Sequence, residues 1–323
     1  MEELANRLTL RHLRVVIAIA DESSMIRAAK RLNMTQSAVT KSLQSAEFQL
    51  GVLLFSRKSG GLAPTIYGEA LIAQARLITS QLDHAAQEIA DLRDGTGGRV
   101  AIGTLLAASP VLLPRAIALL RQKRPKLVIS VMEGTDDLLI PALQAGKLDF
   151  IVGRIPDWRQ RSDLQQDVLL TDKACIVVRP GHPLAGRKDL ALKDLLKWDW
   201  ILPPPETTLR GQVDRAYREH HLDPPVPVVE SISLLMNRSL LLHTNYLNVW
   251  SWQVASEDAA AGRIVILPVT LPSASSPVGI TSRLNARLSP AAEMLVQTLK
   301  DVAVEMEAGV SRISIPQGTR RQK

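Results

Sequence analysis

The sequence has 323 residues, 46% of them hydrophobic and 22% charged, which excludes a disordered or collagen-like chain and predicts two or three compact units. Its early apolar run, VVIAIA at 15–20, is closed by two acidic residues and is too short for a secretory core or a membrane span, so we expect a cytoplasmic protein. The single cysteine, Cys175, excludes an internal disulfide, and its apolar neighbours predict a buried structural thiol rather than a nucleophile.

Positive charge is concentrated near the N-terminus. The whole chain has a formal net charge of +7, and residues 6–65 hold nine Lys or Arg against three acidic residues, an excess of six. Such a segment suits a polyanion, because neutralising phosphates releases counterions. The alternative is a solvated basic face without a partner, and charge alone does not decide between the two.

Three short helices are predicted at the start of the chain. They cover about 9–20, 24–32 and 35–50, with Thr9 and Thr35 as N-caps. Two short helices joined by a tight turn form a helix-turn-helix.

The third helix has one polar face. Its apolar residues lie mainly along one stripe, whereas Gln36, Ser37, Thr40, Lys41 and Gln44 recur at i, i+1, i+4, i+5 and i+8 on the opposite side. These are hydrogen-bonding groups of the kind that read base edges in the major groove. Each one alone is more simply an ordinary surface residue, but the whole set favours a recognition helix.

A small wing is predicted after the helices. In LLFSRKSGGLAPTIYG, residues 53–68, two apolar stretches flank a Gly-Gly pair, which predicts a hairpin with two cations near a phosphate or a minor groove. The DNA-binding candidates are therefore Arg27, Gln36, Ser37, Thr40, Lys41, Gln44, Arg57 and Lys58.

The segment LTLRHLRVVIAIADESSMIRAAKRLNMTQSAVTKSLQSAEFQLGVLLFSRKSGGLAPTIYGEALI resembles the LysR-type transcriptional regulators in the order and spacing of its elements. One departure is Ser37, where members of this family often carry proline; it bears on the base contacts and not on the fold. The resemblance implies a winged helix-turn-helix domain over residues 1–65 that binds double-stranded DNA.

A long helix is predicted from Thr65 to about Leu92. Apolar residues repeat every seventh position in two series, Leu71, Ile78, Ala85 and Leu92, and Ala75, Leu82 and Ile89. This is the pattern of a coiled-coil seam, and the alternative is a helix packed on its own domain. In the family this helix pairs with that of a second subunit, which implies a homodimer, and tetramers are common.

A glycine-rich hinge, DGTGG at 94–98, is predicted to close the linker region of residues 66–98. It lacks the Lys-Ser/Thr ending of a phosphate-binding P-loop, so a linker is favoured over a nucleotide site.

Beyond the hinge the pattern changes to alternating strands and helices, predicted at 99–103, 110–123, 126–133, 136–145 and 149–153. Ser109 is the expected N-cap of the first of these helices, with Pro110 in its first turn. Alternation of this kind indicates an α/β unit with a largely parallel sheet.

A second α/β unit is predicted to begin at KACIVV (173–178) and to include helices near 208–220 and 232–242, while VGITSR and SPAAEMLVQTLKDVAVE return to the first unit. The region resembles the two-lobed effector-binding domain of LysR-type regulators, similar to type 2 periplasmic solute-binding proteins. The implied divisions are lobe 1 at about 99–172 and 277–308, lobe 2 at about 173–276, and a basic flexible tail at 309–323.

Ligands of parallel α/β units bind at the carboxyl ends of strands, often at helix N-termini, whose free N–H groups favour anions. Candidates with this placement are Thr104, Leu105, Ser109, Thr135, Thr207, Thr208, Arg210, Ser233 and Asn245. Each is individually more simply a helix cap or a turn residue, but together they are expected to line the cleft. We expect a small organic anion as co-inducer, with a sugar or an aromatic acid left open.

Trp250 and Trp252 are candidates for an aromatic wall of this cleft, although core packing is the simpler role.

The alternative function is an enzyme or a solute-binding protein built on the α/β part. The six histidines lack metal spacing such as HExxH, and the sequence has no GxSxG elbow and no dinucleotide glycine pattern. A DNA-binding head favours instead a non-enzymatic regulator without a resident cofactor or metal. By resemblance, a pair of heads reads a partly palindromic promoter site and affects RNA polymerase access, as activator or repressor.

Overall fold

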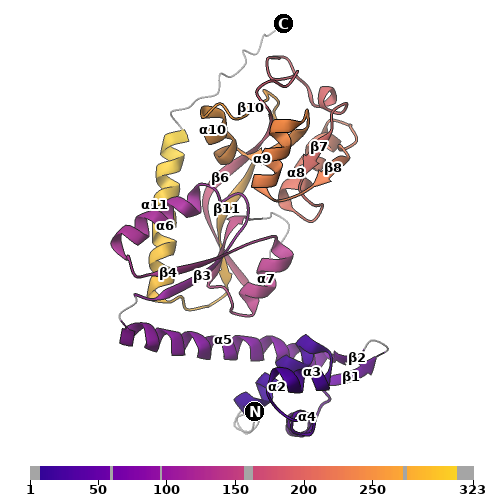
Figure 1. The fold of residues 1–323 in the computed structure, drawn as a ribbon, viewed down its shortest axis with the longest axis vertical. Coiled ribbons are helices and arrows are strands. Elements are labelled where there is room, and N and C mark those ends of the chain that lie inside the picture. Colours follow the sequence, from indigo (N-terminus) through magenta and orange to yellow (C-terminus); the bar gives the residue numbers. More distant parts are fainter. Residues whose placement is uncertain (1–7, 59–60, 95–96, 156–162, 272–274, 311–323) are drawn as a thin grey trace. The chain divides into compact units, whose positions relative to one another are not determined.

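The structure is a computed structural model that describes residues 8–58, 61–94, 97–155, 163–271 and 275–310 (Figure 1). The chain forms two compact units, one of residues 1–98 with 141–148 and the other of residues 99–140 with 149–323. Most of the predicted basic tail at 309–323 and part of the predicted hinge at 94–98 lie outside the described residues.

The N-terminal unit contains three short helices, a two-stranded wing and one long helix. In chain order these are α2 (Leu10–Glu22), α3 (Met25–Arg31), α4 (Gln36–Leu50), β1 (Phe55–Lys58), β2 (Gly61–Pro64) and α5 (Ile66–Asp94). The two strands pair antiparallel. All six elements were predicted from the sequence, and α2 and α5 each extend two residues beyond their expected ends.

Side-chain caps set the starts of the short helices. Thr9, Ser24 and Thr35 cap α2, α3 and α4, because their hydroxyl oxygens accept backbone N–H groups that have no partner within the helix. Helix α4 ends at Gly51, whose φ of 69° lies in the left-handed region that glycine adopts without a Cβ penalty. These caps fix the length and the entry point of the predicted recognition helix.

The VVIAIA run forms the centre of this unit's core. Val15, Val16 and Ile19 are fully buried, and they belong to one cluster with Ala28 and Ala29 of α3. The two alanines have small side chains, so α3 can pack closely against α2. An apolar run too short to span a membrane is thus explained as the buried side of a helix.

The C-terminal unit contains two α/β lobes joined by two long strands. Lobe 1 contains β3 (Arg99–Thr104), α6 (Leu112–Lys123), β4 (Val128–Glu133), the first part of α7 (Asp136–Gln144), β5 (Phe150–Arg154) and α11 (Pro290–Val310), while residues 141–144 of α7 are counted with the N-terminal unit. Lobe 2 contains the 3-10 helix η1 (Leu192–Leu195), β7 (Trp200–Leu202), α8 (Thr208–Glu219), β8 (Pro227–Glu230), α9 (Leu234–His243), β9 (Leu247–Ser251), α10 (Trp252–Ala260) and β10 (Val265–Ile266). The joining strands are β6 (Leu164–Val178) and β11 (Ser275–Arg283).

The strand order is β4-β3-β5-β11-β6-β9-β7-β8, with β10 paired to β6. Pairs within each lobe are parallel, namely β3 with β4 and β5, and β7 with β8 and β9. The long strands β6 and β11 pair antiparallel with each other and with β9 and β5 respectively. The expected largely parallel sheet is therefore correct within the lobes but not between them.

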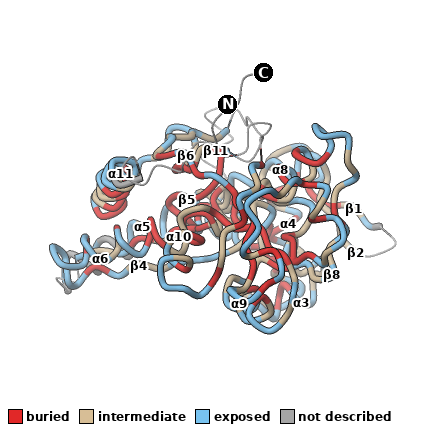
Figure 2. Tube along the Cα trace, turned by 90° about the horizontal axis from the view of Figure 1, so that it is seen from above, coloured by how far each residue is buried: buried red, intermediate tan, exposed pale blue. Residues whose placement is uncertain are grey.

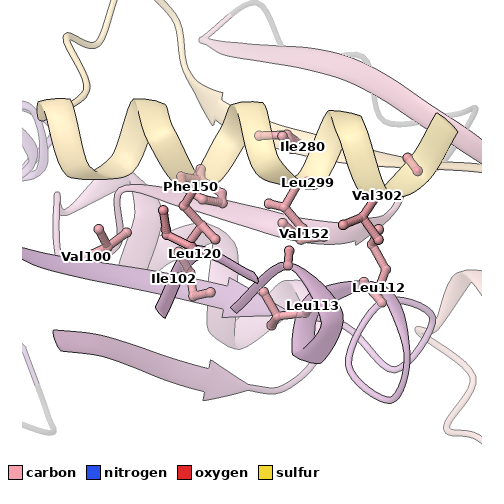
Figure 3. Close-up of a cluster of buried hydrophobic side chains, with 14 of the residues drawn as sticks. Val100, Ile102, Leu112, Leu113, Leu120, Phe150, Val152, Ile280, Leu299 and Val302 are labelled. Carbon is pink, nitrogen blue, oxygen red and sulfur yellow. The ribbon is translucent and has the colours of Figure 1, made fainter. Parts of the chain in front are cut away.

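Each lobe has its own hydrophobic core. In lobe 1, Ile102, Phe150 and Val152 of the sheet pack with Leu299 and Val302 of α11 (Figure 3). Helix α11 is buried along one side only, as Figure 2 shows. The last helix of the chain therefore completes the first lobe, as predicted.

Strand β6 passes from one core to the other. Leu170 belongs to the lobe 1 cluster, whereas Ala174, Ile176 and Val178 belong to the lobe 2 cluster. The prediction that a new unit begins at KACIVV was incomplete, because the strand starts at Leu164 and this segment is its second half.

Two further details differ from the sequence prediction. Helix α6 begins at Leu112 after Val111, whose side chain makes no cap hydrogen bond, so the prediction of Ser109 as N-cap was wrong. The short strands β7 to β10 were not predicted, because strands of two to five residues carry too little periodicity to recognise. Helix α10 was not predicted either.

No helix in the described part of the chain is both long and apolar enough to cross a bilayer.

Gly68→Ala is expected to destabilise the N-terminal unit by about 1–3 kcal/mol. A Cβ at this position would overlap the backbone carbonyl oxygen of Leu54, which has no rotamer to move away. Urea unfolding followed by circular dichroism measures the effect. Gly211→Ala is the control, because a Cβ there meets no atom within 4 Å and alanine favours the helix. An unchanged midpoint for Gly68→Ala would contradict this packing.

Candidate DNA-binding face and effector pocket

Helix α4 presents a polar face to solvent. Gln36, Lys41 and Gln44 are exposed, whereas Val39 and Leu43 on the other side are buried in the core of the N-terminal unit. The buried stripe holds the helix in place, so the polar face is the surface on which a partner can bind. The structure therefore brings the predicted reading residues together on one exposed face.

Two further members of this face are engaged within the helix. The hydroxyl of Thr40, which is half-buried, donates to the Gln36 carbonyl oxygen at 2.9 Å. Ser37 Oγ lies 3.1 Å from the hydroxyl of the capping residue Thr35. These short side chains are held close to the backbone, so the longer Gln36, Lys41 and Gln44 extend furthest from the helix.

The predicted phosphate-binding cations differ in their freedom. Arg27 on α3 is exposed, but its Nε donates to the Glu22 carbonyl oxygen at 3.1 Å and lies 3.5 Å from a Glu22 carboxylate oxygen. Arg57 on the wing strand β1 is exposed. The side chain of Lys58 lies outside the described residues. The DNA contacts of all three remain predictions.

A histidine completes the cap of α2. Thr9 N donates to His12 Nδ1 at 3.3 Å, and His12 N donates to Thr9 Oγ1 at the same distance. This reciprocal pair is a capping box with histidine in the place usually held by Glu or Gln. Nδ1 can accept only when it is unprotonated. Burial, and then the charge of Arg11, lower the pKa of His12, which favours that form.

A pocket lies between the two lobes of the C-terminal unit. Its volume is about 70 Å³. Lobe 1 lines it with the loop after β3, the loop after β4 and the end of β5, and lobe 2 lines it with the loop into α8, Ile232 and Ser251. All of these segments, including Ile232 just after β8, lie at or just beyond the carboxyl end of a parallel strand, where ligands of α/β units bind.

Four predicted effector-binding residues line this pocket, namely Leu105, Thr135, Thr207 and Thr208. Leu105 packs tightly against the backbone of Gly153, where an added Cβ would overlap the leucine side chain. The walls also include other apolar side chains, and the carboxylates at the pocket belong to Glu133, Asp136 and Glu206.

Five predicted effector-binding residues do not line this pocket: Thr104, Ser109, Arg210, Ser233 and Asn245. Thr104 is only 1% exposed, within β3. Ser233 caps α9, which is the simpler role that the sequence left open.

The predicted cation, Arg210, is engaged elsewhere. Its Nε donates to Asp214 at 3.0 Å, and its Nη1 donates to Glu230 at 3.4 Å. Asn245 is likewise held, because its Oδ1 accepts from Arg179 Nη2 at 2.8 Å. Neither residue lines the pocket.

The cation that lines the pocket is Arg154, which sequence reasoning missed. Its side chain is 5% exposed and forms an ion pair with Asp172, which is fully buried on β6. Asp172 also accepts from Ser251 Oγ at 2.9 Å. Arg154 lies at the end of β5, and the only sequence signal for it was its position directly after the predicted strand DFIVG.

Burial acts on both members of this pair. It lowers the pKa of Arg154, an effect that the nearby Asp172 carboxylate opposes. It raises the pKa of Asp172, an effect opposed by the Arg154 charge and the Ser251 hydrogen bond. Two buried charges are stable only when paired, so each residue depends on the other.

Cys175 and Trp250 are core residues. Both are buried in one lobe 2 cluster, as the simpler interpretations predicted, and burial raises the pKa of the Cys175 thiol far above its usual range. Trp252 is half-buried and packs on the same cluster. Neither tryptophan lines the pocket. Among the described residues there is no group of three His, Cys, Asp or Glu placed to hold a metal ion.

Family comparisons agree with this arrangement. Residues 10–69 match the bacterial regulatory helix-turn-helix protein, lysR family, and residues 93–304 match the LysR substrate binding domain. This protein belongs to the LysR family of transcriptional regulators. It is a DNA-binding regulator whose C-terminal unit is the effector-binding domain of that family.

The regulator is similar to curated relatives over most of its length. It is 34% identical to the HTH-type transcriptional regulator GbpR of Azospirillum brasilense, over 92% of this chain and 87% of the relative. It is 29% identical to the HTH-type transcriptional regulator PcaQ of Agrobacterium fabrum, over 94% of this chain and 97% of the relative.

Solved structures of the family have the same fold. Full-length OxyR C199D from Pseudomonas aeruginosa matches with a TM-score of 0.64 at 25% identity, covering 91% of this regulator and 95% of that chain. Full-length CbnR complexed with its target DNA matches with a TM-score of 0.63 at 20% identity, covering 91% and 100%.

The N-terminal unit of the regulator is expected to lose stability as the pH falls below about 6.5, the ordinary histidine pKa. The pKa of His12 is lowered by folding, so the cap contributes fully above the unfolded value and is lost as the pH falls through the folded value. Unfolding at pH 7.5 and pH 5 measures the change. His12→Gln keeps an acceptor in the capping box and is expected to lose less between these pH values; an equal loss would argue against the histidine.

Asp172→Ala is expected to destabilise the C-terminal unit by about 3–5 kcal/mol, because it leaves the Arg154 guanidinium buried without its counter-charge. Arg154→Met/Asp172→Leu removes both charges and is expected to cost less than the two single changes combined. Urea unfolding of Asp172→Ala, Asp172→Leu, Arg154→Met and the double variant measures this coupling. Strictly additive costs in the cycle of Arg154→Met and Asp172→Leu would contradict the pairing.

Proposed function

We propose that this regulator recognises a partly palindromic promoter site through α4, as a homodimer joined by α5, and that a small organic anion switches it. The observation that carries the DNA part is the exposed face of Gln36, Lys41 and Gln44 on a helix capped by Thr35. A helix of 15 residues with such a face fits the major groove. We place this activity in the cytoplasm and assign the chain no catalytic role.

The dimer proposal is supported by the apolar residues of α5. Ile78, Leu82 and Ile89 are 47%, 43% and 69% exposed, and they occupy the two heptad series predicted for a seam. Exposed apolar side chains at heptad spacing favour pairing with another helix. Two heads related by a two-fold axis then read half-sites one or more helical turns apart. Tetramers formed from two such dimers follow the family.

The effector class is supported by the inner end of the pocket. Arg154 provides N–H groups there, and the N-termini of α7 and α8 open onto the pocket from opposite lobes. Glu133 and Glu206 are exposed, so their charges are solvated. They therefore weaken the binding of an anion less than buried carboxylates would. An acidic group directed inward, with an apolar body along the walls, is the arrangement that best fits this pocket.

The size of the effector is bounded by the same pocket. A volume of about 70 Å³ lies well below the roughly 300–1,000 Å³ of pockets that hold drug-sized ligands. We therefore propose a compact molecule of comparable size, which favours a small acid over a sugar. Its binding would change the balance between lobe arrangements, hence the spacing of the DNA-binding heads and the access of RNA polymerase.

Genome-wide binding followed by DNase I footprinting tests the function. Wild-type protein is expected to protect dyad-related half-sites, and Gln36→Ala/Lys41→Ala is expected to lose at least tenfold in affinity, because a good bidentate base contact contributes about 1–3 kcal/mol.

Gln122→Ala/Lys123→Ala is the matched control. It removes the same two residue types and the same charge from exposed positions on α6 in the C-terminal unit, so the footprint is expected to persist. Equal loss in both double variants would assign the effect to charge alone. Equal occupancy by the α4 variant and wild type would remove α4 as the reading helix.

A further inference from the structure

One glutamine joins the two lobes beside the pocket. Gln212 lies on the buried side of α8 in lobe 2 and is 7% exposed. Its Oε1 accepts from Arg154 Nη1 at 2.8 Å, and its Nε2 donates to Ser276 Oγ at 2.6 Å. One side chain from lobe 2 thus contacts the last residue of a lobe 1 strand and the joining strand β11.

An amide fits both of these contacts. Arg154 can only donate, so its partner must be an acceptor, and the Ser276 hydroxyl accepts from the Gln212 NH₂ group. The neighbours of Gln212 on α8 are the core residues Leu209, Val213 and Ala216. A polar side chain at such a position destabilises the fold unless it is fully hydrogen-bonded, so an apolar residue would be the simpler choice for packing alone.

The same guanidinium faces the effector pocket. Arg154 lines the pocket and bonds both Gln212 and Asp172, and Ser251 lines the pocket and bonds Asp172. A ligand oxygen that approaches Arg154 therefore meets a guanidinium that is already hydrogen-bonded to Gln212 of lobe 2. An anionic oxygen is a stronger partner for a guanidinium than a neutral amide oxygen, so it can compete with Gln212.

We propose that Gln212 is the positioning residue of this regulator: its bond to Arg154 favours the lobe arrangement described here, and an anionic effector shifts the arrangement by competing for Arg154. The competition depends on the proposed function, because it assumes a ligand in this pocket. The positioning role itself does not, and it is tested on the protein alone. The energetic basis is the loss of one hydrogen bond to a buried charge, enough to change the ratio of two lobe arrangements about tenfold.

Distances between spin labels on the two lobes test the positioning role. Lys123→Cys on α6 of lobe 1 and Lys197→Cys in lobe 2 provide exposed labelling sites in the full-length chain. The native Cys175 is buried and its thiol pKa is raised, so it takes up little label. Dilution with unlabelled protein removes distances between subunits. Pulsed electron resonance then gives the distribution of lobe separations.

Three variants separate positioning from simple stability. Gln212→Met keeps the volume and removes both hydrogen bonds, and it is expected to broaden or shift the distribution. Gln212→Glu keeps an acceptor for Arg154 and is expected to retain the wild-type distribution. Glu257→Ala breaks the exposed ion pair between Arg115 and Glu257, which joins the lobes at 2.9 Å; as an exposed pair contributes little, no shift is expected.

A folded Gln212→Met protein with the wild-type distribution would overturn the proposal. Should this variant fail to fold, Gln212→Ala takes its place, because it also removes both hydrogen bonds: a broadened or shifted distribution supports the proposal, and the wild-type distribution contradicts it. The measurement needs neither DNA nor effector, so its outcome is independent of the footprint. A shifted distribution with no footprint would leave the positioning role intact and remove the proposed function. A wild-type distribution with a dyad-related footprint would remove the positioning role and leave the proposed function intact.

Discussion

The C-terminal unit depends on the passage of two antiparallel strands from one lobe to the other. Strand β6 changes cores between Leu170 and Ala174, and Asp172 is the buried residue between them. A carboxylate at such a point needs a buried counter-charge, and Arg154 at the end of β5 supplies it. The charges therefore lie where the lobes meet, and the pocket opens beside them. The site and the join between the lobes use the same residues.

The N-terminal unit could be predicted almost completely from the sequence, because its structure is set by local signals. Hydroxyl caps at Thr9 and Thr35, glycine at position 51 and apolar spacing along three helices determine where each element begins, ends and packs. The exposed face of α4 follows directly from this spacing. Local signals did not reveal which polar side chains already have a partner within the protein. Arg27 is an example, because it contacts Glu22.

The C-terminal unit was predictable in class but not in the details of its site. Four candidate residues line the pocket because they follow strand ends, and that rule is local. The partners of Arg154 are 18 and 58 residues away in the chain, so no spacing in the sequence brings them together. Arg210 was the wrong choice of cation for the same reason: it carries the right charge at a helix start, but Asp214, one turn along, and Glu230 engage it.

The absence of a side chain at Gly153 has a consequence for ligand range. Leu105 rests against this glycine, so the position of a pocket wall is set by a residue behind it. A methyl group at Gly153 would press the leucine forward and leave every residue in the lining unchanged. Two regulators of this fold with identical pocket residues can therefore accept ligands of different size. Comparing linings alone would miss the position that separates them.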